Sequence, residues 1–217
     1  VRALADTVRA TSDCAIGYEA ATALLDGLED FADEVKSHLQ ARACAAGVGQ
    51  TVPCETLCPA HVDVPAYIAL VAEGRYAEAV NVVRRDNPFP TACSFVCEHP
   101  CEQRCRRTLL DAPVNIRGIK RFAVDGAPAD QVPPPPRGAD TGRTVAVVGG
   151  GPSGLSCAYF LGLMGHRVTV FEAREQLGGM MRYGIPAYRF PRERLDEDVR
   201  GILNAGGITA RCGMAVG

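Results

Sequence analysis

The sequence predicts a mainly α-helical, cysteine-rich region followed by the first part of a doubly wound α/β domain. Two observations carry this prediction. Seven of the ten cysteines lie between Cys44 and Cys105, in a segment where short helices are expected. From residue 143 onward, an apolar stretch, a glycine-rich turn, a helical segment and a second apolar stretch follow one another. That order is typical of the start of a Rossmann-like fold.

The composition excludes several classes of protein. A length of 217 residues allows one or two domains, and the net charge of −2 creates no field that attracts nucleic acid. Tryptophan is absent and aromatic residues are few, which argues against a base-stacking surface. We find no apolar run of about 18 residues that predicts a membrane span, and no signal peptide. The chain starts at Val1 and ends just after a strand-like stretch, so we expect a fragment of a longer, cytoplasmic protein.

Four segments are expected along the chain. A secreted disulfide domain spreads its cysteines through a loop-rich chain, whereas these cysteines crowd one segment, which favours metal binding in a reducing compartment. The segments are a helical tail of a preceding module at 1–43, a helical cysteine region at 44–125, a proline-rich linker at 126–142 and an incomplete Rossmann-like domain at 143–217.

The helical segments are predicted from apolar spacing and capping residues. An apolar stripe in the first segment predicts core or interface packing; its members are Leu24, Leu28, Phe31, Val35 and Leu39. In the cysteine region, Asp63 is placed to cap a helix that begins near Pro65 and ends at Gly74. A second helix follows and ends before Pro88. The proline run of the linker favours an extended conformation and marks a boundary.

The glycine-rich turn predicts a dinucleotide site. Gly149, Gly151 and Gly154 form the G-x-G-x-x-G pattern between an apolar strand and a helix expected from Pro152 to Met164. The first glycine permits the tight turn, the second lets the backbone approach a pyrophosphate, and the third lets helix and strand pack closely. Phosphates then lie over the helix N-terminus. Glu172 directly follows the next expected strand, Arg167–Phe171, and is placed there to hold ribose hydroxyls.

Four thiols recur at every fourth position: Cys93, Cys97, Cys101 and Cys105. On one helix they would share a face but extend over roughly 18 Å, which is too long for one metal centre. Pro100 also disfavours an unbroken helix. The four thiols therefore either fold around a centre through turns or divide between centres.

The remaining cysteines of this region favour iron–sulfur clusters over zinc. Cys44, Cys54 and Cys58 precede the four thiols, and Pro59 directly follows Cys58, as in the Cys-Pro ending of bacterial ferredoxin motifs. Zinc ribbons use C-x2-C pairs, which do not occur here. A zinc-stabilised docking module attached to a thioredoxin-reductase-like flavoprotein is the alternative. It requires a redox-active C-x-x-C, which these residues lack.

The motifs "GGGPSGL", "VTVFEA", "LGGMMRYGIP" and "PVNIRGIKRFA" resemble glutamate synthase small subunits and the corresponding part of dihydropyrimidine dehydrogenase, from about Cys54 to Arg211. The resemblance implies FAD on the Rossmann-like domain and two [4Fe–4S] clusters on the helical domain. The implied FAD contacts are Gly149, Gly151, Pro152, Ser153, Gly154, Glu172, Ala173, Arg174, Gly178 and Gly179. Cys54 and Cys105 would share one cluster, and Cys58, Cys97 and Cys101 the other.

The chain departs from the family pattern in its ligand count. The family's first group usually has four cysteines, but only Cys44 precedes Cys54 here. Some members use a Gln or Glu ligand where this chain has Lys120, whose ammonium has no lone pair to donate. Seven cysteines must therefore cover eight iron positions. We hypothesise that Cys93 replaces the missing carboxylate or amide ligand, and that His61 or an upstream residue completes the first cluster.

The resemblance implies electron transfer between NAD(P)H, FAD and the clusters. No acid–base or nucleophile–base pair suggests a separate catalytic centre. The family's NAD(P)-binding domain and the second half of its FAD domain would follow later, so this fragment alone is not expected to turn over NAD(P)H. We expect a redox partner subunit or a ferredoxin, in a hetero-oligomer. The basic runs around Arg104 and Arg117 are expected to be solvated faces, or to dock an acidic ferredoxin.

Residues 1–43 weakly resemble the C-terminal end of the NADH-binding flavoprotein subunit of NADH dehydrogenase. In that resemblance Cys14 completes a cluster whose other ligands lie upstream; the alternative is a buried structural cysteine. Cys157 and Cys212 are expected to be packing residues.

Overall fold

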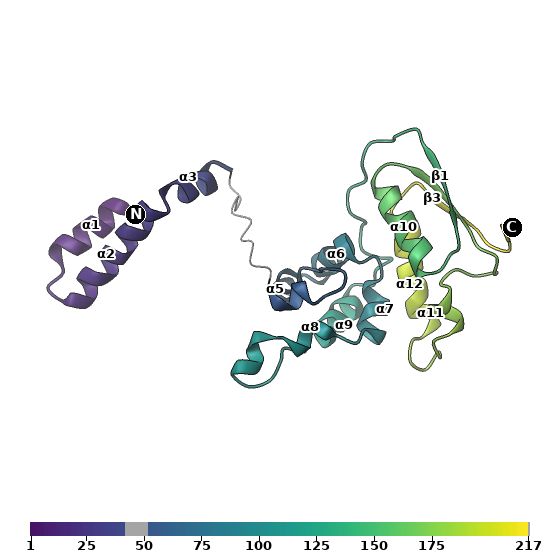
Figure 1. The fold of residues 1–217 in the computed structure, drawn as a ribbon, viewed down its shortest axis with the longest axis horizontal. Helices are drawn as coiled ribbons and strands as arrows, with labels where there is room; N and C mark the ends of the chain where they lie inside the picture. Colours follow the sequence, from purple (N-terminus) through teal and green to yellow (C-terminus); the bar gives the residue numbers. More distant parts are fainter. Residues whose placement is uncertain (42–51, 217) are drawn as a thin grey trace. The chain divides into compact units, whose positions relative to one another are not determined.

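The computed structural model describes residues 1–41 and 52–216 (Figure 1). The chain divides into two compact units, Val1–Thr51 and Val52–Gly217. Cys44, one of the predicted cluster ligands, lies outside the described residues. No helix within the described ranges is long and apolar enough to cross a membrane.

Residues 1–41 of the first unit form the helices α1 (Arg2–Thr11), α2 (Ala15–Asp30) and α3 (Ala32–Ala41). Helices α1 and α2 pack together and bury Ala5, Ala21 and Leu25. The predicted apolar stripe does not form one core face, because α2 ends at Asp30 and Phe31 breaks the helical register. Leu24, Phe31 and Leu39 are 46%, 59% and 74% exposed. The prediction of core packing is therefore wrong for these three residues within this unit.

The second unit begins with a helical region, and its predicted helices are confirmed. Asp63 Oδ1 accepts the backbone N–H of Ala66 at 3.0 Å, so this residue caps α5 as expected. Gly74 adopts a φ of 75°, which ends that helix. Tyr67, Val80 and Val124 are fully buried between the helices. The elements are α4 (Pro53–Thr56), α5 (Val64–Ala72), α6 (Tyr76–Asp86), α7 (Pro90–Val96), α8 (Pro100–Gln103), the 3₁₀ helix η1 (Arg106–Leu109) and α9 (Ile116–Gly126).

The α/β part of this unit has the predicted Rossmann-like order. Three parallel strands form a sheet in the order β1-β2-β3, with Val147 opposite Val170 and Val170 opposite Ala210. Helix α10 contacts all three strands and α12. The carboxyl ends of parallel strands meet at one edge, so the turn after β1 faces the end of β2. The elements are β1 (Thr144–Val148), α10 (Pro152–Leu163), β2 (Arg167–Phe171), α11 (Met180–Tyr183), α12 (Arg192–Leu203) and β3 (Ile208–Arg211).

The segment predicted as a linker is packed against both parts of the second unit. Ala129 and Val132 are buried. Arg84, which is 1% exposed, donates hydrogen bonds to their carbonyl oxygens at 3.2 and 3.1 Å. The same guanidinium donates to the carbonyl of Gly201 in α12 at 2.7 Å. One buried arginine on α6 therefore joins the helical region, the proline-rich segment and the α/β part.

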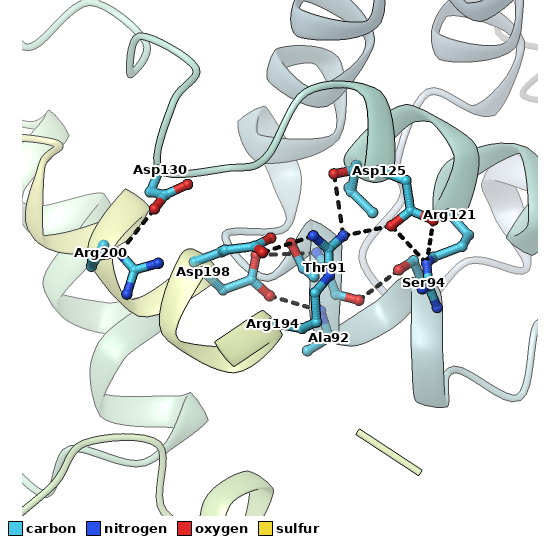
Figure 2. A network of polar contacts seen from close by, with 11 residues as sticks. Thr91, Ala92, Ser94, Arg121, Asp125, Asp130, Arg194, Asp198 and Arg200 are labelled. Atoms are coloured by element: carbon cyan, nitrogen blue, oxygen red, sulfur yellow. Dashed lines mark hydrogen bonds and ion pairs between the residues drawn. The ribbon is translucent and has the colours of Figure 1, made fainter. Parts of the chain in front are cut away.

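A polar network joins α7 to α12 (Figure 2). Asp198 is completely buried, and its two carboxylate oxygens accept the backbone N–H groups of Thr91 and Ala92 at 3.1 and 2.7 Å. Arg194, four residues earlier on α12, pairs with Asp125 of α9 at 2.7 Å. Through these contacts the α/β part holds the helix that carries Cys93.

The stability contributed by Asp198 is expected to fall as the pH rises. Burial raises the pKa of Asp198 to about 7, whereas an unfolded aspartate titrates near about 3.9. Between these values the folded state binds more protons than the unfolded state, so the contribution is largest below about pH 4 and is lost as the pH approaches about 7. Urea unfolding of wild type and Asp198→Asn, at about pH 5 and about pH 8, measures this effect. An equal pH dependence in both proteins would contradict the expectation.

Candidate functional site

The contact between α4 and α8 brings the two cysteine groups together. Cys54 lies in α4 and Cys58 follows it, while Cys101 lies in α8 and Cys105 follows it. Pro53 begins the first short helix and Pro100 begins the second, so each group is wound around one tight turn rather than one long helix. The four thiols at every fourth position therefore lie on two short helices and the residues that follow them, not on one helix.

Electrostatic effects on the pKa values of the thiols indicate which of them lie near one another. Burial raises the pKa of the Cys54 thiol, and the charge of Cys105 raises it further. Burial raises the pKa of Cys101 to about 11, and Cys58 and Cys97 add repulsion. Coulomb energy falls with distance, so these couplings mark spatial proximity. The division into Cys54 with Cys105, and Cys58 with Cys97 and Cys101, that the family resemblance implies stays a prediction.

Tyr67 lies in the same core cluster as Cys101, Cys54 and Cys58. It is fully buried on α5, and its hydroxyl donates to the carbonyl of Ile116 at 3.2 Å. Burial raises the pKa of this phenol, and Cys101, Cys58 and Cys54 raise it further, in that order. Tyr67 thus anchors α9 to α5 within reach of both groups. Apolar periodicity marks it only as a core residue, so sequence reasoning missed this position.

A cavity of about 270 Å³ opens beside Cys54 and Cys105. Its lining consists of Val52, Pro53, Cys54, Pro65, Arg104, Cys105, Arg106, Arg107 and Val114. Within residues 1–41 and 52–216, no three His, Cys, Asp or Glu side chains gather closely enough to hold a single metal ion. The two thiols in this lining are half of the four thiolates that a [4Fe–4S] cluster takes.

Several hydrogen bonds join Cys97 to the residues around it. Its Sγ accepts the backbone N–H of His99 at 3.3 Å, and its carbonyl accepts from Arg117 Nη1 at 2.9 Å. His99 adopts a left-handed φ of 42°, which is uncommon for a residue with a side chain. Glu102 accepts the backbone N–H of Arg117 at 2.9 Å and lies 3.1 Å from His99 Nδ1. Glu102 and Arg117 are supporting residues that the cysteine spacing did not indicate.

The two residues proposed for the unusual ligand positions occupy different environments. Cys93 lies on α7; burial raises the pKa of its thiol, while Lys120 and a hydrogen bond with Asn87 lower it. The charge of Cys97 raises the pKa of the Cys93 thiol further. His61 is exposed, with a φ of 51°, and its backbone N–H bonds to the carbonyl of Cys58 at 2.9 Å. Both residues therefore lie near the thiol groups, and their role as ligands stays a prediction.

The glycine-rich turn has the geometry that its sequence predicts. Gly149 adopts a φ of 102°, which favours glycine. A Cβ at Gly154 would lie 1.9 Å from the carbonyl oxygen of Gly149, so only glycine allows helix and turn to approach this closely. A cavity of about 460 Å³ lies over the turn. Its lining consists of Val147, Val148, Gly149, Gly151, Pro152, Ser153, Gly154 and Cys157.

Gly178 and Gly179, predicted to lie along the dinucleotide, do reach this turn. Gly178 donates its N–H to the carbonyl of Gly150 at 2.8 Å. A Cβ at Gly179 would lie 2.6 Å from the Cα of Gly151. Gly150 and Gly151 of the turn therefore form one surface of backbone atoms with Gly178 and Gly179, which come from a distant segment. Such a surface at the N-terminus of α10 fits a pyrophosphate, because unpaired N–H groups and the helix dipole favour negative charge.

Glu172, at the end of β2, stabilises the glycine-rich turn through hydrogen bonds. It is 9% exposed; one carboxylate oxygen accepts the N–H of Gly150 at 2.6 Å, and the other accepts the N–H of Arg174 at 2.9 Å. Each oxygen keeps a second lone pair that can accept a ribose hydroxyl. The guanidinium of Arg174 lies 4.2 Å over the ring of Tyr183, which anchors the loop after β2.

The three isolated cysteines are exposed. Cys157 lines the cavity over the glycine turn, because the buried face of α10 consists of Leu155, Ala158, Tyr159 and Gly162. Cys212 follows β3 and is also exposed. The prediction that both are packing residues is wrong. Cys14 is exposed at the N-cap of α2, so the buried structural alternative is wrong too.

Comparison with known proteins identifies two families. The family described as dihydropyrimidine dehydrogenase domain II, 4Fe-4S cluster, matches residues 25–132. Residues 25–132 belong to that domain II family. The family described as NAD(P)-binding Rossmann-like domain matches residues 147–202. Domain II thus contains both thiol groups, and the Rossmann-like match contains the glycine turn together with Glu172.

Three relatives of this chain are subunits of larger enzymes. The beta subunit of NADPH-Fe(3+) oxidoreductase from Geobacter sulfurreducens is 37% identical over 89% of this chain and 30% of the relative. The beta subunit of NADP(+)-dependent formate dehydrogenase from Moorella thermoacetica is 40% identical over 77% of this chain and 27% of the relative. The glutamate synthase [NADPH] small chain from Mycobacterium tuberculosis is 37% identical over 76% of this chain and 34% of the relative. The chain therefore spans about a third of these relatives' length.

Proposed function

We propose that this chain conducts electrons between a flavin and iron–sulfur clusters in an NAD(P)H-dependent oxidoreductase. The observation that carries the proposal is the placement of two coupled thiol groups and a dinucleotide-binding turn in one compact unit. The relatives, named as NADPH- or NADP(+)-dependent enzymes, support the same chemistry.

Two thiol groups would hold two [4Fe–4S] clusters. Cys54 and Cys105 belong to one cluster, and Cys58, Cys97 and Cys101 to the other; Cys44 and Cys93 complete the set of seven cysteines. Thiolate ligation, burial and hydrogen bonds to sulfur are the means by which a protein sets cluster potential. The N–H of His99, bonded to Cys97 Sγ, contributes one such hydrogen bond.

FAD is the dinucleotide proposed for the glycine turn. The backbone around Gly149, Gly151, Ser153 and Gly154 would bind its pyrophosphate, and Glu172 its ribose. Bound together, a flavin and clusters connect the two-electron chemistry of a nicotinamide with one-electron transfer. The residues of this chain bind and orient these groups. Asp198 and Arg84 fix the helical region to the α/β part, which holds the two binding sites in a defined relation.

A redox partner subunit or a ferredoxin is the proposed electron acceptor or donor, in a hetero-oligomer. Three relatives are named as beta subunits or a small chain, which supports assembly with other subunits. A cytoplasmic location is also proposed, because free thiols in such number require a reducing compartment.

Iron and acid-labile sulfide, measured per chain on anaerobically purified protein, test the proposal. About eight of each is the expected result for two clusters, with a brown colour and a rhombic EPR signal after reduction. FAD released by denaturation is expected at about one per chain. Zinc without sulfide would overturn the proposal in favour of a structural metal domain, although no finding at present supports that alternative.

A further inference from the structure

A buried lysine lies among the cysteines of the helical region. Helix α9 turns one face to the core, and the buried residues on it are Ile116, Lys120, Ala123 and Val124. Lys120 is 8% exposed, although its three companions on this face are apolar. The ammonium nitrogen of Lys120 is not one of the fully buried side-chain atoms without a partner in the described residues, so the aliphatic stem is buried and the charged end keeps some contact with water. A charge held at the edge of the core in this way interacts with any anion close to it.

No carboxylate provides that charge within the described part of the chain. Over residues 1–41 and 52–216, Lys120 makes no ion pair and its side chain makes no hydrogen bond. The adjacent Arg121, by contrast, pairs with Asp125 at 2.7 Å and lies 3.6 Å over the ring of Phe95. Lys120 therefore differs from Arg121 in two ways: its side chain is buried, and it has no carboxylate partner among the described residues.

The positive charge of Lys120 affects the pKa of two thiols. Its charge opposes the effect of burial on the pKa of Cys101 and on that of Cys93, and in each case it is the largest influence after burial. These cysteines lie on α8 and α7, and α9 packs directly against α7. Glu102 and Asp198 are the acidic groups that act on the same two thiols. Glu102 accepts a hydrogen bond from the N–H of Arg117, and Asp198 accepts two from α7.

We propose that Lys120 is the internal counter-ion of the cluster bound by Cys97 and Cys101, and that its fixed positive charge raises the reduction potential of that cluster. The proposal rests on the proposed function, because it requires a cluster at these thiols. Reduction adds one negative charge to a thiolate-bound cluster. A nearby cation stabilises the reduced form more than the oxidised form. Lys120 is therefore a positioning and tuning residue, not a ligand.

Three variants of the anaerobically purified holoprotein test this role. Lys120→Met removes the charge and keeps the length of the side chain, whereas Lys120→Arg keeps the charge. Arg121→Met is the matched control, because it removes an equal charge from the next residue of α9, where the side chain is 39% exposed. Iron and sulfide are measured first, followed by the midpoint potential of each cluster in an EPR-monitored redox titration.

The expected result is a more negative midpoint for one cluster in Lys120→Met, with near wild-type midpoints in Lys120→Arg and Arg121→Met. If Lys120→Met fails to retain that cluster while Lys120→Arg retains it, the requirement for charge supports the same role. An unchanged midpoint in a fully loaded Lys120→Met protein would overturn the inference, as would equal loss of the cluster in both lysine variants. Absence of iron and sulfide from wild type would instead show that the proposed function is wrong.

Discussion

Replacing Cys101 with serine is expected to lower the iron and sulfide content from about eight to about four of each per chain. Cys101 is the most buried of the described cluster cysteines, and Cys58 and Cys97 both raise the pKa of its thiol. Serine keeps the size of the side chain but is a poor ligand for iron. The loss should therefore be confined to one cluster, with the protein still folded.

The division of the cysteines makes this prediction sharper. Cys105→Ser is expected to remove the other half of the iron, because Cys105 couples with Cys54 rather than with Cys101. The double variant should retain almost none. Cys212→Ser is the matched control, since this thiol is exposed after β3. Complete loss of iron in either single variant, with unchanged far-UV circular dichroism, would show that the thiols do not divide as proposed.

Replacing Gly151 with alanine is expected to weaken FAD binding by about tenfold or more, equivalent to about 1.4 kcal/mol or more, without unfolding the protein. Gly151 has a φ of −79°, which alanine adopts readily. A Cβ there would meet only the Cα of Gly179 at 3.7 Å, an ordinary contact. Gly151 lines the cavity over the turn, so the methyl group would take up space where the backbone must approach the pyrophosphate. Titration of the apoprotein with FAD, followed by flavin fluorescence, measures the change.

Gly154→Ala separates the folding role of the turn from its binding role. Its Cβ would lie 1.9 Å from the carbonyl oxygen of Gly149, so the turn and α10 must move apart. We expect a loss of about 2–3 kcal/mol in the free energy of unfolding, together with loss of flavin. If Gly151→Ala destabilises the fold as much as Gly154→Ala, the proposed distinction between the two glycines is wrong.

Local patterns predicted most of the backbone correctly. The cap at Asp63, the end of α5 at Gly74 and the strand–turn–helix around Gly149 depend on residues close together in the chain. Such patterns failed where exposure depends on distant contacts. Leu24 fitted a helical stripe and Cys157 a buried helix face, yet both side chains are exposed. Periodicity reports which residues share a face, but it does not report whether another element covers that face.

By itself, the sequence determined the type of chemistry this chain can support. Thiol number and spacing, together with the glycine turn, specify ligand types and a phosphate-binding backbone through local geometry alone. The tertiary structure decided which groups meet. It placed Cys54 near Cys105, buried Lys120 among thiols, and joined Asp198 to the start of α7. These relations arise from the packing of helices that are distant in the chain, and the spacing of residues along one segment carries no information about such packing.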